Sequence, residues 1–191
     1  MIKQASKAVF YFGYGQNSSR EMMAAITQRS MNDIVSWEAV LEGYELCVQD
    51  FAHVPPRSQE LLRKSWGDIA DSLRFYVIRP KEGGIVKGRV SLLTEQGYDL
   101  VKNQELIAFG WRGEVDGEVL TPGNRDKIAV KTEVLGVDQK ITSVVDEENY
   151  SPFLNHKETT LRVAKETSDY YLELLRNKEG TGAGNPTESK N

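Results

Sequence analysis

Residues 13–18, "GYGQNS", are the first segment whose residue types could support binding chemistry. They follow the apolar run "AVFYF" and precede a predicted helix over residues 19–29. Two glycines separated by one residue allow the backbone to turn tightly and to approach a ligand closely. Ser18 or Ser19 can cap the helix, and the N–H groups and partial positive charge at a helix N-terminus suit an anion. The segment therefore predicts an anion-binding loop.

Glu105 is the candidate for proton transfer. If residues 94–106 form a helix capped by Thr94, then Tyr98, Val101 and Glu105 share one face of it. This face is apolar and should point inward, which places Glu105 against the core at the helix C-terminus. Desolvation and the negative helix end would both raise the pKa of its carboxyl group, so that it could accept and return a proton near neutral pH. The alternative is a structural Glu that reaches solvent from a fraying helix end.

Other catalytic chemistries have little support in the residue types. His53 and His156 stand in different segments, Cys47 is the only cysteine, and no zinc-ligand spacing is present. A serine triad would need one of the two histidines, and neither stands in a recognisable motif. Cys47 lies within the apolar alternation of "YELCV", which predicts a packed, unreactive thiol. We therefore expect no metal site.

The elements that would position these residues form a small α+β domain with a mixed, curved β-sheet or barrel and flanking helices. The alternation of apolar and polar residues over 35–48 slips by one at Gly43, which indicates a bulge or a turn. Residues 50–70, with "HVPPRS", indicate a long loop, and "KEGG" indicates a hairpin turn. The predicted strands are 8–13, 35–48, 72–80, 84–93, 107–115 and 126–137, with "TPGNRD" as the turn between the last two.

The C-terminal part predicts one long helix and a tail. Ser151 and Pro152 are a cap and a first helical residue. One face of this helix carries Leu161, Ala164, Ser168, Tyr171 and Leu175. Residues 178–191 are polar and rich in Gly without periodicity, which predicts a disordered tail. Residues 1–177 are then a single domain.

The composition is that of an ordinary globular protein. The chain has 191 residues, 39% hydrophobic and 27% charged, with a formal net charge of −4. Lys and Arg are scattered, which argues against nucleic acid or an acidic membrane as the main partner. No apolar run approaches a membrane span, and the first residues lack the apolar stretch of a signal peptide. We expect a cytoplasmic protein; the oligomeric state cannot be predicted.

On these residues the sequence resembles the γ-glutamylcyclotransferase-like proteins. In that family a "YGSN"-type loop after the first strand and a Glu after the central helix form one pocket. Here the loop is "YFGYGQN" and the acid stands in "LVKNQEL". The resemblance continues through "AVLEGYELCV", "GGIVKGRVSLL" and "YSPFLN", and covers nearly the whole chain except the tail. Gln16 replaces the commoner Ser, and Leu106 follows Glu105 where Gly is usual.

The resemblance implies a cofactor-independent reaction on a small γ-glutamyl compound. The α-amine of the γ-glutamyl amide attacks its own γ-carbonyl, which releases 5-oxoproline and an amine. Glu105 would be the general acid and base. The substrate-binding residues would be Gly13, Tyr14, Gly15, Gln16 and Asn17, and the backbone N–H groups of residues 14–17 could hold the α-carboxylate or the oxyanion.

Two other interpretations remain at this point. A non-catalytic small-molecule binding module could use the same fold. A nucleotide-binding oxidoreductase could use "GYGQNS", although Ser18 stands in place of the third Gly of the dinucleotide fingerprint. It would also need an acidic residue about 20 residues beyond the loop, at the end of a second parallel strand. Glu38 is in range but lies inside the alternating segment.

Overall fold

The computed structural model describes residues 7–109, 113–121, 127–134, 143–144 and 156–181. Within these ranges the strands are β1 Ala8–Gly13, β2 Ser36–Asp50, β3 Arg74–Thr94, β4 Gly113–Leu120, β5 Lys127–Val134 and β6 Ser143–Val144. The helices are α1 Arg20–Thr27, α2 Pro56–Trp66, α3 Glu95–Phe109 and α5 Lys157–Thr181, and short 3-10 helices lie at Gln16–Ser18, Met31–Asp33, Phe51–His53 and Gly67–Ser72.

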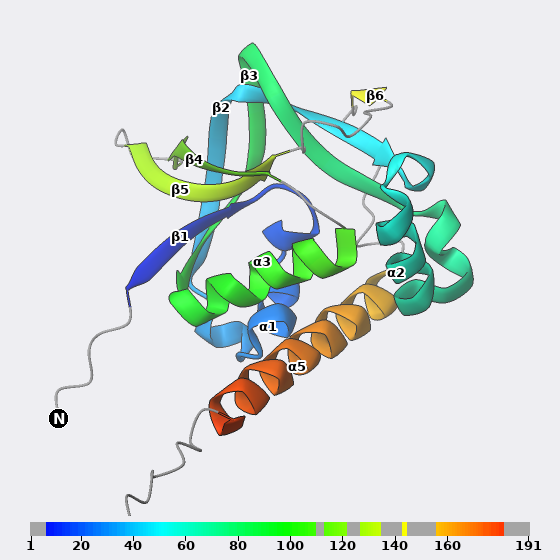
Figure 1. Ribbon diagram of the computed structural model, residues 1–191. Coiled ribbons are helices and arrows are strands. Elements are labelled where there is room, and N and C mark those ends of the chain that lie inside the picture. The colour runs from blue at the N-terminus through cyan, green and yellow to red at the C-terminus, as the bar shows by residue number, and fades with distance from the viewer. Residues whose placement is uncertain (1–6, 110–112, 122–126, 135–142, 145–155, 182–191) are drawn as a thin grey trace, which may run out of the picture.

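The sheet curls until its ends meet. Its strand order is β3-β1-β5-β4-β2-β6, and a further pairing of β2 with β3 closes five of the strands into a ring. Among the described pairings, β1 with β5 is parallel and the others are antiparallel. In Figure 1 the strands curve over the upper part of the molecule, and α1, α3 and α5 lie below them. The mixed, curved α+β fold predicted from the sequence is confirmed.

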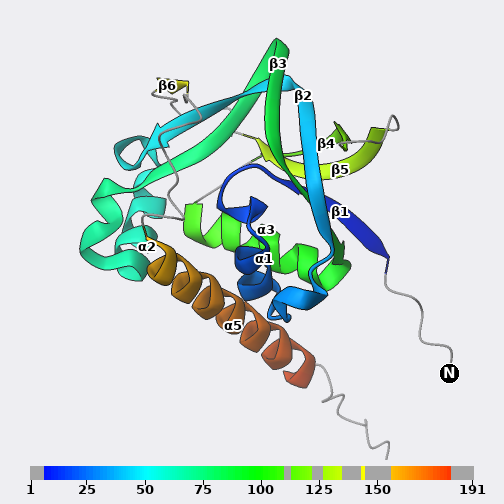
Figure 2. The ribbon, with the colours of Figure 1, turned by 180° about the vertical axis from the view of Figure 1, so that it is seen from behind.

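Strand β1 separates two hydrophobic clusters. Phe12 points into the ring, where the buried cluster comprises Phe12, Ala39, Leu41, Ile78, Val86, Val90, Val119 and Val130. Tyr11 points to the other side, into the cluster that joins β1 to α1, α3 and α5. Successive side chains of a strand point to opposite faces, so one short strand contributes to both clusters. Both ribbon views show α3 lying between the sheet and α5 (Figures 1 and 2).

The alternation in β2 and its slip at Gly43 are confirmed. Ala39 and Leu41 before the slip, and Leu46 after it, all belong to or pack against the cluster inside the ring. The pairing with β3 changes register between Glu42 and Tyr44, and Gly43 has a positive φ of 83°. A slip of one residue in the alternation would turn the following apolar side chains to the outer face of the strand. The extra residue of a bulge turns them back toward the inside of the ring.

The predicted hairpin at "KEGG" is wrong. Residues 72–80 and 84–93 do not pair with each other; they belong to β3, which pairs along its length with β2. Opposite the β2 bulge, four residues of β3 lie between the partners of Tyr44 and Glu42, so both strands bend there. A Cβ at Gly84 would lie 2.4 Å from the backbone oxygen of Tyr44. The two glycines next to each other indicate this bend as readily as a turn.

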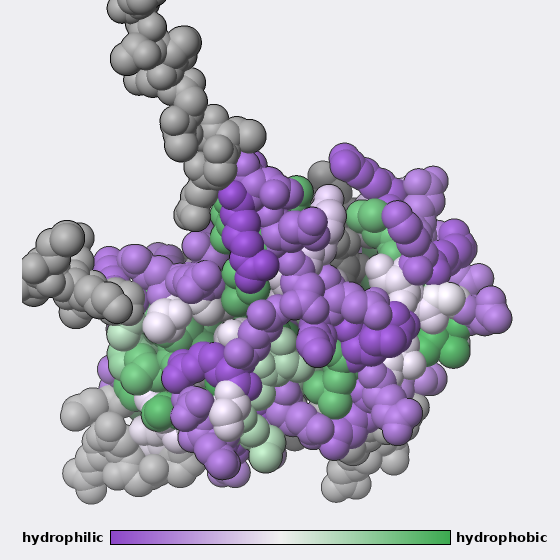
Figure 3. Space-filling model, turned by 90° about the horizontal axis from the view of Figure 1, so that it is seen from below, coloured by the Kyte–Doolittle hydropathy of each residue, from purple (hydrophilic) through white to green (hydrophobic). Residues whose placement is uncertain are grey.

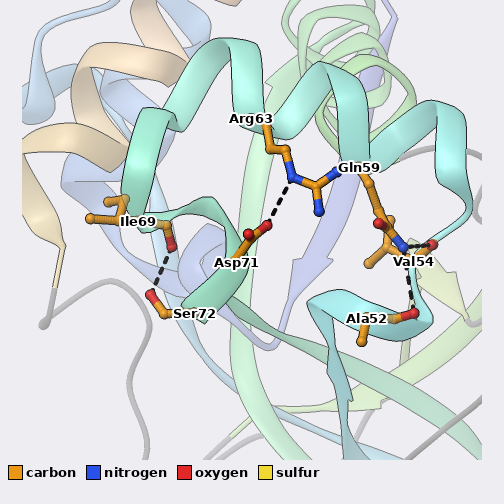
Figure 4. A network of polar contacts seen from close by, with 7 residues as sticks. All are labelled: Ala52, Val54, Gln59, Arg63, Ile69, Asp71 and Ser72. Atoms are coloured by element: carbon orange, nitrogen blue, oxygen red, sulfur yellow. Dashed lines mark hydrogen bonds and ion pairs between the residues drawn. The ribbon is translucent and has the colours of Figure 1, made fainter.

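The predicted loop over residues 50–70 is also wrong, because it contains α2. Pro56 is at the first helical position, where a missing N–H is harmless. Ser58, Leu62 and Trp66 then face inward at a spacing of four. Figure 4 shows Gln59 Nε2 donating to the carbonyl oxygens of Val54, at 2.8 Å, and Ala52, at 3.4 Å, and Arg63 Nε donating to Asp71 Oδ1 at 2.9 Å. These contacts tie the helix to its flanking turns.

Helices α3 and α5 have different ends from those predicted. Helix α3 continues to Phe109, so Glu105 stands one turn before its C-terminus, and β4 begins only at Gly113. Helix α5 begins at Lys157 and continues to Thr181, four residues past the predicted domain end. The inward face of α5 is confirmed by buried Ala164 and Ser168. The predicted cap at Ser151 and Pro152, most of the turn "TPGNRD" and the tail beyond residue 181 lie outside the described residues.

The surface seen from below is largely hydrophilic. Figure 3 shows this face, with hydrophobic patches separated by hydrophilic side chains. The exposed large hydrophobic side chains include Tyr170 and Leu174 of α5 and Leu61 of α2. Among the described residues, no helix combines the length and the apolar composition needed to cross a bilayer.

Candidate active site

The loop after β1 is shaped by close backbone packing at its two glycines. A Cβ at Gly13 would lie 2.5 Å from the backbone oxygen of Asn17, and one at Gly15 would lie 3.3 Å from Cβ of Tyr76. The loop ends in a capped helix, because Ser19 Oγ accepts from the N–H of Met22 at 3.4 Å. Ser19, one of the two predicted caps, is thus the N-cap of α1. Glycine is required at both positions because other atoms of the protein approach closely. The backbone conformation does not require it, since neither residue has a positive φ.

The side chain of Asn17 connects this loop to Glu105. Its Nδ2 donates to Glu105 Oε1 at 2.7 Å and to the hydroxyl oxygen of Tyr11 at 3.1 Å. The three residues come from β1, from the loop that follows it and from α3. A 2.7 Å bond from an amide to a carboxylate is at the short end of N–H···O distances, as expected when the acceptor is charged.

All three side chains are buried. Glu105 is 6% exposed, Asn17 is 5% and Tyr11 is 3%. Removing a carboxylate from water disfavours its charged form, whereas a donated hydrogen bond favours that form. Glu105 is therefore a carboxyl group that is removed from water and accepts a hydrogen bond from an amide. A carboxyl group in such a setting is suited to proton transfer.

The predicted inward face of α3 is confirmed. Tyr98 is 9% exposed and Val101 is fully buried, and both belong to the cluster that contains Tyr11. The rings of Tyr11 and Tyr98 lie 6.2 Å apart between centroids, with a tilt of 49°. The alternative, a Glu105 that reaches solvent from a fraying helix end, is wrong. The helix continues for a full turn past it, and the packed face fixes its direction.

The five residues predicted to bind substrate occupy different settings. Asn17 contacts Glu105 through its side chain. Tyr14 packs against the cluster inside the ring, with its ring centroid 6.5 Å from that of Phe12. Gln16 begins the 3-10 turn Gln16–Ser18, and Gly13 and Gly15 lie at the end of β1 and in the loop before that turn. The first N–H groups of a helical turn have no acceptor within the helix, so those of Gln16 and Asn17 are the donors that the loop can offer.

Two residues of the site were not predicted from the sequence. Tyr11 contacts Asn17. Its position on the face of β1 opposite Phe12 follows from the alternation of side chains along a strand. Tyr76 lies against Gly15, although it comes from the distant strand β3. No local pattern marks Tyr76, because only the barrel brings β3 to the loop.

The other candidate groups lie apart from this site. Cys47 is fully buried, and burial raises the pKa of its thiol, an effect that nearby Arg79 partly opposes. Within the described ranges, no group of three or more His, Cys, Asp and Glu side chains is placed to hold a metal ion. The side chain of Glu38 is 76% exposed and stands inside β2, which pairs antiparallel with β3 and β4. This topology contradicts the second parallel strand that the nucleotide-binding interpretation requires.

The fold is shared with solved structures, although no family model and no curated protein matches the chain. A structure described as gamma-glutamyl cyclotransferase has a TM-score of 0.54 and 16% identity, with 97% of this chain and 92% of the other covered. An uncharacterized protein from Homo sapiens has a TM-score of 0.53 and 17% identity, with 96% and 92% covered. An Arabidopsis thaliana protein has a TM-score of 0.53 and 20% identity, with 99% and 100% covered.

These similarities extend over nearly the whole of each chain, and at these identities they establish the fold. The chain has the γ-glutamylcyclotransferase-like fold, as its loop, its carboxylate and their order along the sequence predicted.

Proposed function

We propose that this protein is a γ-glutamylcyclotransferase, which converts a γ-glutamyl amide into 5-oxoproline and a free amine. The observation that carries the proposal is the 2.7 Å hydrogen bond between Asn17 of the glycine loop and the buried carboxylate of Glu105. This bond joins the carboxylate that we assign to proton transfer to the loop that we assign to substrate binding. The fold, which is that of a structure described as gamma-glutamyl cyclotransferase, supports the same assignment.

The reaction needs few groups because the substrate contains its own nucleophile. The α-amine forms a bond to the γ-carbonyl carbon, and the bond from that carbon to the leaving nitrogen breaks. Glu105 accepts a proton from the α-ammonium group, which frees the attacking lone pair, and gives it to the leaving nitrogen as the bond to that nitrogen breaks. The nitrogen of the new ring then gives up its second proton by the same route, so the amine leaves as an ammonium ion and the carboxyl group returns to its starting state. The enzyme must also hold the substrate in the bent conformation in which its two ends meet.

The loop would supply the binding groups. The N–H groups of Gln16 and Asn17 stand at the start of a short helical turn and suit a carboxylate or a developing oxyanion. The close contact of Gly13 with the backbone of Asn17 keeps these donors in a fixed conformation. Donors that are fixed before the substrate arrives need no reorganisation during the reaction, and this is the main source of their effect on rate.

A panel of γ-glutamyl compounds tests the proposal. The purified protein is incubated with γ-glutamyl dipeptides, glutathione and γ-glutamyl alkylamines, and 5-oxoproline is measured by mass spectrometry against a Glu105→Gln control. We expect 5-oxoproline from at least one class, with the released amine in equal amount, and a rate lower by at least about 10²-fold from the variant. Binding of these compounds without product would instead indicate a non-catalytic binding module. Neither binding nor product would contradict both functions.

A further inference from the structure

We propose that Tyr11 is a positioning residue that acts on Glu105 through the side chain of Asn17. The inference rests on the proposed function, since it assigns Glu105 the proton transfer. Tyr11 and Glu105 accept from the same nitrogen, Nδ2 of Asn17, at 3.1 and 2.7 Å. A primary amide nitrogen carries two hydrogens. Both are therefore engaged, one by the phenol and one by the carboxylate.

The phenol of Tyr11 is the rigid end of this series of hydrogen bonds. Tyr11 lies within β1, a strand hydrogen-bonded on both sides, opposite Ser91 of β3 and beside Lys131 of β5. Asn17 lies in the 3-10 turn between β1 and α1. An asparagine side chain has two rotatable bonds, so one hydrogen bond to Glu105 would leave its amide group able to tilt. The second bond, to a side chain fixed by the sheet, removes that freedom.

The amide in turn fixes Glu105. A carboxylate can only accept, so the orientation that presents Nδ2 is the one that stabilises the ionised form. The Oδ1 atom of Asn17 is buried without a hydrogen-bond partner among the described residues, so reversing the amide group would place this oxygen against the carboxylate. The titratable side chains in the cluster that packs on this face of α3, or against it, are Tyr11, Tyr98 and Tyr171, and Lys102 Nζ lies 5.6 Å from the centroid of the Tyr98 ring.

The Tyr11→Phe variant tests the proposal, because it keeps the ring that packs against Tyr98 and removes only the oxygen. We expect kcat for 5-oxoproline release to fall about 10-fold to 100-fold, with KM unchanged within a factor of about two. In a Glu105→Gln background the same substitution should lower the residual rate less than about twofold, because residues that act as a unit are not additive. Tyr171→Phe is the matched control, a tyrosine on α5 packed against the same cluster.

A measurement independent of activity completes the test. The 13C signal of the Glu105 carboxyl group, assigned by its loss in Glu105→Gln, is titrated in the wild type, Tyr11→Phe and Tyr171→Phe. We expect the curve to move to higher pH in Tyr11→Phe alone, because a poorly oriented amide stabilises the carboxylate less. An unchanged curve, or equal losses of kcat with and without Glu105, would overturn the positioning role. Absence of turnover in the wild type would contradict the proposed function, and the titration would still decide whether Tyr11 acts on Glu105.

Discussion

The amide of Asn17 donates a 2.7 Å hydrogen bond to the carboxylate of Glu105, although 88 positions separate the two residues in the chain. This contact joins the glycine loop after the first strand to the third helix. It turns two separate sequence features into one candidate site.

Glu105→Gln should slow turnover strongly and keep the fold. Gln retains the shape of Glu and can still accept from Asn17 through its carbonyl oxygen, but it cannot take a proton. The rate should fall by at least about 10²–10⁴, the usual contribution of proton transfer. Substrate affinity should stay within a few-fold, and the melting temperature should hold or rise because a buried charge is removed. Glu95→Gln, an exposed acid at the start of the same helix, is the control. Turnover near the wild-type value would contradict the mechanism.

Asn17→Asp should make stability strongly dependent on pH. The substitution places a second buried carboxyl group against Glu105 and removes the amide donor. At pH 7 we expect the free energy of unfolding to fall by about 3–5 kcal/mol, the usual penalty of an uncompensated buried charge. Repulsion between the two carboxylates raises the pKa of the pair in the folded state. The loss of unfolding free energy should therefore shrink as the pH falls and the two carboxyl groups share a proton. Urea unfolding from pH 4 to 8 measures this, with exposed Asn32→Asp as the control.

Gly13→Ala should damage the protein more than Gly15→Ala. The new methyl group at residue 13 would meet backbone atoms of Asn17 at 2.5 Å, whereas at residue 15 it would meet the side chain of Tyr76 at 3.3 Å. Side chains yield more easily than backbone, so we expect Gly13→Ala to cost about 1–3 kcal/mol and Gly15→Ala less. Both variants are compared by thermal unfolding and by 5-oxoproline release. A larger loss for Gly15→Ala would show that the loop is held differently.

Cys47 should be unreactive in the folded protein and should affect stability only at high pH. Its thiol is fully buried, so alkylation at pH 8 should require unfolding, and protein in guanidinium chloride provides the fully labelled reference.

Burial raises the pKa of this thiol in the folded state. The unfolded chain therefore loses the proton first, and stability should decrease as the pH rises past about 8.5. Cys47→Ala should lack this part of the decrease; an identical slope would exclude the thiol as its source.

Local patterns in the sequence determined much of what surrounds the site. The apolar run before Gly13 gave β1, Ser19 capped α1, and the slip at Gly43 became the bulge of β2. The spacing of Tyr98, Val101 and Glu105 predicted the inward face of α3. Each of these depends on residues within a few positions of one another, so the physical cause can be seen in a short stretch of sequence.

Two local predictions were wrong because tertiary contacts overrode them. The glycines of "KEGG" support a turn as well as a bend, and pairing with β2 over the whole of β3 selected the bend. Pro55, just before α2, and Pro56, its first residue, indicate a loop when considered alone. Packing of Leu62 and Trp66 in one cluster with Phe51 and Phe75 stabilises the helix.

The site itself was decided by the tertiary structure. The sequence supplied Glu105 on an inward face and Asn17 in a glycine loop, but nothing local states that one contacts the other. That contact exists because β1 lies in the ring with its outer face toward α3, so Tyr11 and the loop meet the helix. Chain segments so far apart come together only when the sheet closes, since the hydrophobic clusters on its two faces offset the entropy of ordering them.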